Sequence, residues 1–556
     1  MDHMRLLNEV RNRETLNQAF EYACYDRIRT DHYMDFFELE YIISHKSLVL
    51  DELEEELDTI SSFRQRPAYA FFPPKTELCF RRMVYLNFKD LVVRYSLAIV
   101  FAQVLDSQLL PTCFANRRAT GKQAERTLTA DFASDSWPSF CSWQREQAQS
   151  NTTLLRTDIT SFYDSVSHDY LVATFSNALS VPVDSQLMQL FRCILIVPVL
   201  AYSNETKQVQ PAVEMRQGLP IGNNTEGFFA NVYLRDVDYS MSQLKEVQYG
   251  RYNDDMRIFG NDRNEVLKAL RVLQEHLLTK GLNLNTSKTE LAENEEEIDK
   301  LRSHDSDVFQ YFPESDELWY DEDEVDDTTS QITQRIDVPF EQFNRTFKPG
   351  ETLNDNTDAK DFCKFLSMQT QDYSEAELSE RLPQHIQSLK TVLSRWSGSS
   401  RHAAWLLVQS AIYRNVRRQT QLEARKAILD IFADPNVNSY AKYRILHHLT
   451  KLRMRRDGQE FRFLDQLSPE YIERLSEILP DFLSVCDFEL VITTLYTYRA
   501  LGHSEEDLRE LVNRYVTAYD AEPYQNVFYY IGGSSAPVVS ASIASDNEPD
   551  ESIEIY

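Results

Sequence analysis

Two short acidic segments in the centre of the chain carry side chains that could bind metal ions. In residues 154–171 (LLRTDITSFYDSVSHDYL), a predicted strand ends near Asp158. In residues 250–260 (GRYNDDMRIFG), Asp254 and Asp255 lie at the turn of a predicted hairpin. Adjacent carboxylates repel each other unless a cation neutralises them. We therefore expect the three carboxylates to form an oxygen-rich Mg²⁺ site, although Asn and Asp are also common in an ordinary solvated turn.

A metal site of this kind favours one class of reaction. Two divalent ions activate an attacking hydroxyl and stabilise a leaving pyrophosphate. Two further segments accompany the acidic ones. Residues 216–238 (RQGLPIGNNTEGFFANVYLRDVD) begin with a glycine-containing loop that leads into a helix, and residues 281–291 (GLNLNTSKTEL) follow the hairpin. The order of the four segments is more informative than any one of them.

In this order, the four segments resemble the palm motifs of reverse transcriptases. Asp158 with Phe162-Tyr163 is similar to the first motif, and Gln217–Gly222 (QGLPIG) is similar to the second. Tyr252–Asp255 (YNDD) is similar to the YxDD box, and Gly281–Lys288 is similar to the motif that follows this box. The upstream segments PPKTELCFRRMVYLNFKDLVVRYSLAIV and FANRR are similar, more loosely, to fingers motifs. The resemblance covers about residues 65–291. It implies an α+β right-hand polymerase fold and an RNA-directed DNA polymerase that uses Mg²⁺ and dNTPs.

The resemblance also implies a role for each residue that matches a motif. Asp158 and Asp254 would be direct metal ligands, together with the backbone carbonyl of Ile159. Asp255 would be a supporting carboxylate beside them. Tyr163 would close on a ribose 2′-hydroxyl and so select deoxynucleotides; the alternative is that it is only a packed core residue.

Five further residues would bind the nucleotide. Gln217 would line its pocket, and Lys288 would lie near the triphosphate or pyrophosphate, unless it is a solvated surface lysine. Lys75, Arg81 and Arg82 are candidates to hold the triphosphate, because catalysis of this class depends on positioning and charge neutralisation.

The rest of the chain is predicted to be mostly helical, because only 13 of its 556 residues are glycine and few positive-φ turns are therefore available. An exception is the apolar segment 192–202 (RCILIVPVLAY), which is predicted to form a strand. The expected organisation comprises an N-terminal helical region (1–70), fingers and palm (71–291), an acidic insert or linker (292–350), an α-helical and repeat-like domain (351–532), and a disordered acidic tail (533–556).

The net charge of −29 would disfavour a nucleic-acid partner if the acidic residues were spread evenly. They are not: residues 290–327 hold 17 acidic and 2 basic residues, whereas residues 381–460 hold 15 basic and 5 acidic ones. We expect this basic, helical region to bind RNA or the growing strand through residues such as Arg417, Arg418, Arg455 and Arg456. The alternatives are a solvated helix face or a surface that meets the acidic insert.

The region after Leu291 has no recognisable primer-grip motif, and a large helical C-terminal region follows. In these features the chain looks most similar to bacterial abortive-infection and defence-associated reverse transcriptases. That similarity implies antiphage defence and, as in some members, homo-oligomers, a noncoding RNA partner, and untemplated or protein-primed synthesis. Tyr556 is a candidate priming hydroxyl. An RNA-dependent RNA polymerase and a non-catalytic RNA-binding scaffold remain as alternatives.

The cysteines and the apolar segments indicate the environment of the protein. Its seven cysteines contain no CxxC pair, which is typical of a reducing compartment and gives no sign of structural zinc. The longest apolar run, Tyr95–Leu105, is about half the length that spans a bilayer. We expect a cytoplasmic protein without membrane contact.

Overall fold

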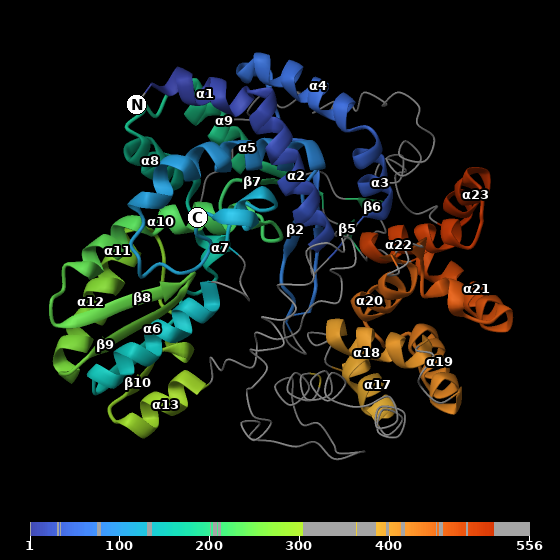
Figure 1. Ribbon diagram of the computed structural model, residues 1–556. Coiled ribbons are helices and arrows are strands. Elements are labelled where there is room, and N and C mark those ends of the chain that lie inside the picture. The colour runs from blue at the N-terminus through green and yellow to red at the C-terminus, as the bar shows by residue number, and fades with distance from the viewer. Residues whose placement is uncertain are drawn as a thin grey trace, which may run out of the picture.

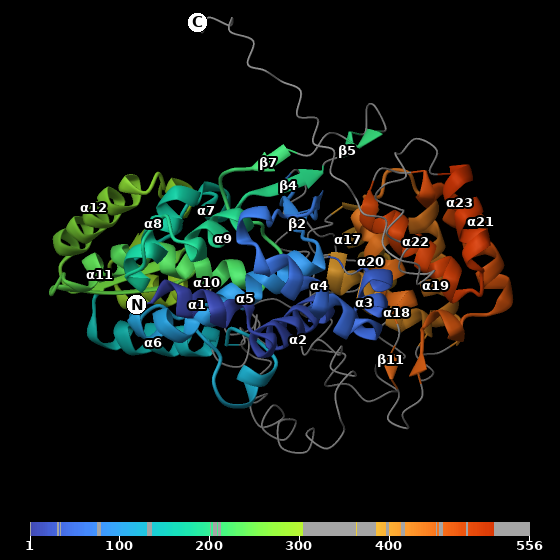
Figure 2. The ribbon, with the colours of Figure 1, turned by 90° about the horizontal axis from the view of Figure 1, so that it is seen from above.

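The computed structural model describes residues 2–29, 33, 35–74, 79–130, 136–200, 202–203, 208–209, 213–303, 363, 385–395, 400–412, 418–451, 453–454, 460–484 and 487–515. Within these ranges the chain is an α+β structure with two four-stranded sheets (Figure 1). A group of helices makes up the C-terminal part, as Figure 2 also shows from above. The expected α+β architecture with a helical C-terminal region is confirmed.

The N-terminal helices pack around one buried helix, α5. Most of its residues are apolar, and almost all of them are buried, which is typical of a helix at the centre of a domain. Asn87 begins α5 by accepting a hydrogen bond from the Lys89 backbone N–H. The helices of this part are α1 (His3–Arg11), α2 (Arg13–Arg29), α3 (Phe36–Ser44), α4 (Lys46–Asp58) and α5 (Phe88–Leu105).

The first sheet lies mostly in the segment expected to form the fingers, and we call it the fingers sheet. Its strand order is β2-β1-β4-β7, with β1 and β4 parallel and the other neighbours antiparallel. The strands are β1 (Ala68–Phe71), β2 (Met83–Tyr85), β4 (Val197–Leu200) and β7 (Val213–Met215), and a separate small hairpin joins β5 (Tyr202–Ser203) to β6 (Gln208–Val209).

The prediction of one strand over 192–202 is wrong in its first half. The helix α9 covers Gln186–Leu195, and strand structure in this segment is confined to Val197–Leu200 and to Tyr202, the first residue of β5. Ser185 caps α9, and its buried residues recur at helical spacing. A short continuous apolar run cannot be assigned to helix or strand from periodicity alone.

The second sheet carries the segments expected to form the palm, and we call it the palm sheet. It lies between two helical layers. Its order is β10-β3-β9-β8, and all neighbours are antiparallel. The opposed residues Leu154 and Phe259 pack toward one layer, whereas the next pair, Leu155 and Ile258, belongs to the core on the other side. The strands are β3 (Thr153–Thr157), β8 (Val247–Tyr252), β9 (Asp255–Gly260) and β10 (Glu290–Ala292). The helices are α6 (Trp137–Ser150) and α13 (Glu295–Ser303) on one face and α11 (Arg235–Ser242) and α12 (Arg263–Thr279) on the other.

Helices also lie between the strands of the two sheets along the chain. They are α7 (Phe162–Ser165), α8 (His168–Leu179) and α10 (Asn224–Tyr233), and one of them, α7, carries the predicted site residue Tyr163.

The C-terminal part consists mainly of helices: α17 (Ile386–Arg395), α18 (Ser400–Ile412), α19 (Arg418–Ala433), α20 (Ser439–Thr450), α21 (Pro469–Leu483), α22 (Phe488–Ala500) and α23 (Glu505–Tyr515). The expectation that the basic region is entirely helical is wrong, because β11 (Arg453–Met454) pairs with β12 (Glu460–Phe461). Strands of two residues are too short for alternation to reveal them. No helix in the described ranges is long and apolar enough to cross a membrane.

The helical C-terminal part shares its core with the fingers and with α3. The ring of Tyr69 in β1 stacks on Phe488 in α22, with centroids 4.4 Å apart. In addition, the Tyr496 hydroxyl donates a hydrogen bond to Glu40 of α3 over 2.6 Å. These contacts place the fingers sheet beside the C-terminal helices, with the palm on the far side (Figure 1).

Candidate active site

The strand register brings the three carboxylates to one end of the palm sheet. Thr157, the last residue of β3, pairs with Met256 of β9. Continuing this antiparallel register by one residue places Asp158 opposite Asp255. Because Tyr252 pairs with Asp255, Asp254 lies in the two-residue turn that joins β8 to β9, next to the end of β3.

The conformation of this turn explains the asparagine in the YNDD sequence. Asn253 has φ +54°, a left-handed conformation that asparagine tolerates better than most residues. The Asn116 amide donates a hydrogen bond to Asn253 Oδ1 over 2.6 Å, and Arg251 Nη1 donates to the Asn253 carbonyl over 3.2 Å. The turn is therefore held from two directions.

Beneath the turn, Arg251 is the centre of a buried polar network. Only 1 % of this residue is exposed, and its guanidinium forms two bonds of 2.7 and 2.8 Å to the Asp238 carboxylate of α11. It also donates to Asn231 Oδ1 of α10 over 2.7 Å, and the Tyr249 hydroxyl donates to Asp238 over 3.1 Å. A buried pair that is this well hydrogen-bonded is stable only while both members are present.

The backbone of the Asp158 segment is held by residues 283–285. The Asn285 N–H donates to the Asp158 carbonyl over 2.7 Å, and the Thr160 N–H donates to the Asn283 carbonyl over 2.9 Å. Peptide groups of successive strand residues are directed to opposite edges. The Ile159 carbonyl is therefore directed away from residues 283–285, which lead into β10, and toward the edge that β9 and the YNDD turn occupy.

Two of the carboxylates are contacted by cationic side chains. Lys288, at the end of a short 3₁₀ helix (Thr286–Lys288), places Nζ 2.6 Å from Asp158 Oδ2. Arg257, which is fully buried, donates to Asp255 Oδ1 over 3.4 Å and to Gln144 over 3.1 Å. Burial opposes the charged form of Lys288, but the hydrogen bond to Asp158 raises the pKa of its amine.

The crowding of the three carboxylates is reflected in the pKa of Asp254. Burial, followed by the negative charges of Asp158 and Asp255, raises the pKa of the Asp254 carboxyl to about 6. A divalent cation would relieve this repulsion.

The donor set fits a hard divalent cation, because two carboxylates and the Ile159 carbonyl are oxygen ligands of the kind that Mg²⁺ prefers. In the part of the chain that is described, however, no three His, Cys, Asp or Glu side chains already stand in metal-binding geometry. Asp158 instead contacts Lys288, and Asp255 contacts Arg257. A bound cation must therefore compete with Lys288 for Asp158.

The raised pKa of Asp254 predicts a pH-dependent metal affinity. Below pH 6 the Asp254 carboxyl holds a proton that a metal ion must displace. We expect the apparent Kd for Mn²⁺ to rise about tenfold per pH unit below about pH 6 and to level off above about pH 7. Free Mn²⁺ measured by electron paramagnetic resonance gives the Kd. Asp254→Asn should bind weakly at every pH, and a wild-type Kd that stays constant between about pH 5 and about pH 8 would contradict the assignment.

The predicted aromatic gate packs against the QGLPIG loop. Tyr163 is partly buried in α7, and its carbonyl accepts a hydrogen bond from the Leu219 N–H over 2.8 Å. Gly218 has φ +85°, and a Cβ there would lie only 3.0 Å from Tyr163 O and Asp164 Cα. Glycine is required at this position for both reasons. Burial, and then the charge of Asp254, raise the pKa of the Tyr163 hydroxyl, so that it stays neutral.

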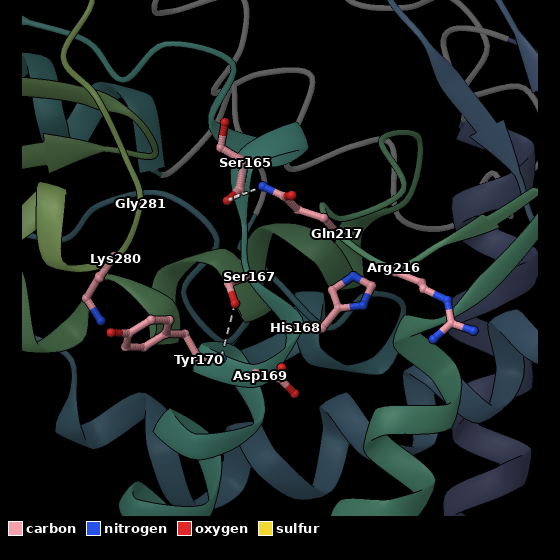
Figure 3. A pocket seen from close by; sticks show the side chains of 9 residues that line it. All are labelled: Ser165, Ser167, His168, Asp169, Tyr170, Arg216, Gln217, Lys280 and Gly281. Carbon is pink, nitrogen blue, oxygen red and sulfur yellow. Dashed lines mark hydrogen bonds between the residues drawn. The ribbon is translucent and has the colours of Figure 1, made fainter. Parts of the chain in front are cut away.

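Gln217 lies beside a pocket of about 250 Å³ between α8 and the QGLPIG loop (Figure 3). Its Nε2 donates to the Ser165 carbonyl over 3.4 Å. The two cationic side chains of this pocket already have acidic partners: Lys280 contacts Asp236 over 2.9 Å, and Arg216 contacts Glu214. The pocket is therefore close to electrically neutral.

Only some of the basic residues predicted to bind the triphosphate or nucleic acid lie within the described residues. Arg81 and Arg82 are exposed just before β2, and Arg82 Nη2 lies 2.9 Å from Asp164 Oδ1. Arg418 is exposed at the first position of α19. The other predicted residues lie outside the described residues: Lys75, Arg417, Arg455, Arg456 and Tyr556.

Three supporting contacts were not expected from the sequence: the Arg251–Asp238 pair, Asn116 on Asn253, and Arg257 on Asp255. A signal existed for Arg257, because residues two apart in a strand share a face. For Arg251 the only signal was a charged residue in a strand of the predicted hairpin, two residues before the turn.

Comparison with known proteins agrees with this geometry. Residues 103–312 match the family model "Reverse transcriptase (RNA-dependent DNA polymerase)". The match contains Asp158, Gln217, Asp254 and Lys288, and it confirms the expectation of an enzyme domain of the RNA-directed DNA polymerase, or nucleotidyltransferase, type. Enzymes of this family generally use divalent metal ions.

The chain also has a weak similarity to a solved structure. Among solved structures, apo telomerase from Candida tropicalis, truncated from its C-terminal domain, is 14 % identical with a TM-score of 0.30. The alignment covers 40 % of this chain and 49 % of the telomerase chain, so this chain spans about half the length of that protein. No curated protein matches the sequence.

Proposed function

We propose that this protein is a Mg²⁺-dependent DNA polymerase of the reverse transcriptase type that adds deoxynucleotides to a DNA strand. The observation that carries the proposal is the convergence of Asp158 and Asp254 at the ends of adjacent strands, inside the region that matches the reverse transcriptase family. Burial, and then the charges of Asp158 and Asp255, raise the pKa of Asp254, as expected where carboxylates are gathered in a partly dry site to hold a cation.

Each residue of the cluster has a definite part in this activity. Asp158, Asp254 and the Ile159 carbonyl would hold Mg²⁺, which supplies activation of the attacking hydroxyl and charge neutralisation at the leaving pyrophosphate. Asp255, which accepts a hydrogen bond from Arg257, adds negative charge to the site from its position at the start of β9. Lys288 brings a positive charge to within 2.6 Å of Asp158, where it can neutralise phosphate oxygens once Asp158 binds metal.

Tyr163 is proposed to exclude the ribose 2′-hydroxyl, and its backbone is held by the QGLPIG loop through the Gly218 contact described above. We expect Tyr163→Val to lower the ratio of kcat/KM for dNTPs over NTPs by about 10- to 200-fold, because a pocket then accepts one more small group. The measurement is single-nucleotide incorporation with each substrate. Tyr239→Val, at an exposed position of α11, is the matched control and should leave the ratio unchanged. An equal ratio in Tyr163→Val and wild type would contradict the role.

The cellular role is proposed to be antiphage defence in the cytoplasm, by a homo-oligomer that associates with nucleic acid such as a noncoding RNA. The exposure of Arg418 on α19 and the basic charge of residues 381–460 support the nucleic-acid part of this proposal, and the defence role rests on the resemblance to defence-associated reverse transcriptases. The large helical part, docked on the fingers, offers a surface for such a partner. The same proposal includes RNA-templated, untemplated or protein-primed synthesis, and Tyr556 is a candidate for the priming residue.

Purification from cells tests this part directly. The RNA and DNA that accompany the wild-type protein are sequenced, and covalent attachment to tyrosine is sought by mass spectrometry. We expect nucleic acid with the wild type and loss of the DNA, but not of the RNA, in Asp254→Asn. Phage resistance that survives in Asp254→Asn would contradict a defence role that depends on DNA synthesis.

A further inference from the structure

One exposed ion pair connects the fingers to the palm beside the proposed nucleotide gate. Arg82 immediately precedes β2, and its Nη2 lies 2.9 Å from Oδ1 of Asp164 in α7. The same nitrogen lies 3.8 Å from Met215 Sδ at the end of β7. Asp164 directly follows Tyr163 in the sequence, and both residues belong to α7.

The position of Asp164 is fixed by its backbone. Its Cα and carbonyl oxygen lie 3.0 Å from the point where a Cβ of Gly218 would stand, so α7 and the QGLPIG loop touch directly. The Gly218 N–H also donates to the Val166 carbonyl over 2.8 Å. The Asp164 backbone is thus held in place next to Tyr163.

The Arg82 guanidinium can leave this carboxylate easily. The two side chains are 45 % and 47 % exposed, and pairs with such exposure contribute little to stability. A guanidinium binds the oxygens of a phosphate in the same bidentate way as those of a carboxylate. A nucleotide triphosphate that reaches Arg82 therefore competes with Asp164.

We propose that Asp164 is a positioning residue that holds Arg82 in the nucleotide-free protein and gives it up to the incoming triphosphate. Asp164 then acts as a built-in competitor: it weakens nucleotide binding, and it links the release of Arg82 to the helix that carries Tyr163. This inference rests on the proposed function, because it takes the triphosphate of a dNTP as the ligand of Arg82.

The test compares Asp164→Asn with the wild type in the full-length protein. Because an exposed pair is weak, we expect Kd and KM for dATP to fall by about two- to fivefold, with kcat unchanged within about twofold. The Kd is measured by calorimetry, independently of turnover. Asp299→Asn is the matched control, since it removes the same charge from another exposed Asp–Arg pair, with Arg302 on α13 at 3.0 Å. It should change neither constant.

A second background separates release of Arg82 from simple repulsion by Asp164. In Arg82→Gln, dATP binding should be weaker than in wild type, and adding Asp164→Asn should then have no further effect. An unchanged or increased Kd in Asp164→Asn would overturn the inference. The same improvement in the Arg82→Gln background would also overturn it, because the effect would then not pass through Arg82. Tighter dATP binding by Asp164→Asn without any turnover by the wild type would instead contradict the proposed function and leave this inference standing.

Discussion

Arg251→Met lowers the free energy of unfolding by about 3–5 kcal/mol, the expected result of breaking a buried ion pair from one side. The Asp238 carboxylate, only 1 % exposed, loses the two guanidinium bonds and retains only weaker donors, namely the Tyr249 hydroxyl and the Cys113 thiol. The Asn253 carbonyl also loses its Arg251 donor, so the YNDD turn is loosened at the same time. Urea denaturation without added metal measures the effect.

Two further variants show whether burial of the pair is the cause. Arg302→Met breaks the exposed pair with Asp299 and should cost less than about 1 kcal/mol. Arg251→Met combined with Asp238→Leu removes both charges and should be more stable than Arg251→Met alone. The account of the turn fails if Arg251→Met is as stable as Arg302→Met.

Asp158→Asn should reduce the rate of dNTP incorporation by at least about 10³-fold, because several kcal/mol of transition-state stabilisation depend on the charge that this residue contributes to the cation site. The substitution keeps the size of the side chain and its place after β3. Single-turnover incorporation measures the rate, and a thermal melt with and without Mn²⁺ measures binding. We expect Mn²⁺ to raise the melting temperature of the wild type and not that of Asp158→Asn.

The matched control is again Asp299→Asn, which should retain wild-type incorporation and the wild-type response to Mn²⁺. Retention of more than about a tenth of the activity by Asp158→Asn would remove Asp158 from the catalytic site.

The parts of the site that could be predicted from sequence depend on local chemistry. A strand that ends at an aspartate and a hairpin with Asn and Asp at its turn can be recognised within single segments, and they indicate Asp158 and Asp254. The order of the four segments then indicates the other residues of the site. Gly218 was indicated only as part of the QGLPIG motif, because its positive φ and its contact with the backbone of Tyr163 and Asp164 are properties of the folded chain.

The parts that could not be predicted depend on contacts between distant segments. Arg251 and Asp238 meet because α11 packs behind β8, and Tyr69 meets Phe488 across more than four hundred residues. No periodicity within a segment contains that information. The apolar run at 192–202 failed for a related reason, since its burial in either state hides the difference between the helix α9 and the strand β4.

The central claim is that Asp158 and Asp254 support DNA synthesis. Its most direct test is to incubate the purified full-length protein and its Asp254→Asn variant with Mg²⁺ and labelled dNTPs or NTPs. The account predicts a DNase-sensitive labelled product from dNTPs, made by the wild type and absent with Asp254→Asn. A product made only from NTPs, or the same amount of DNA from the Asp254→Asn variant, would contradict it.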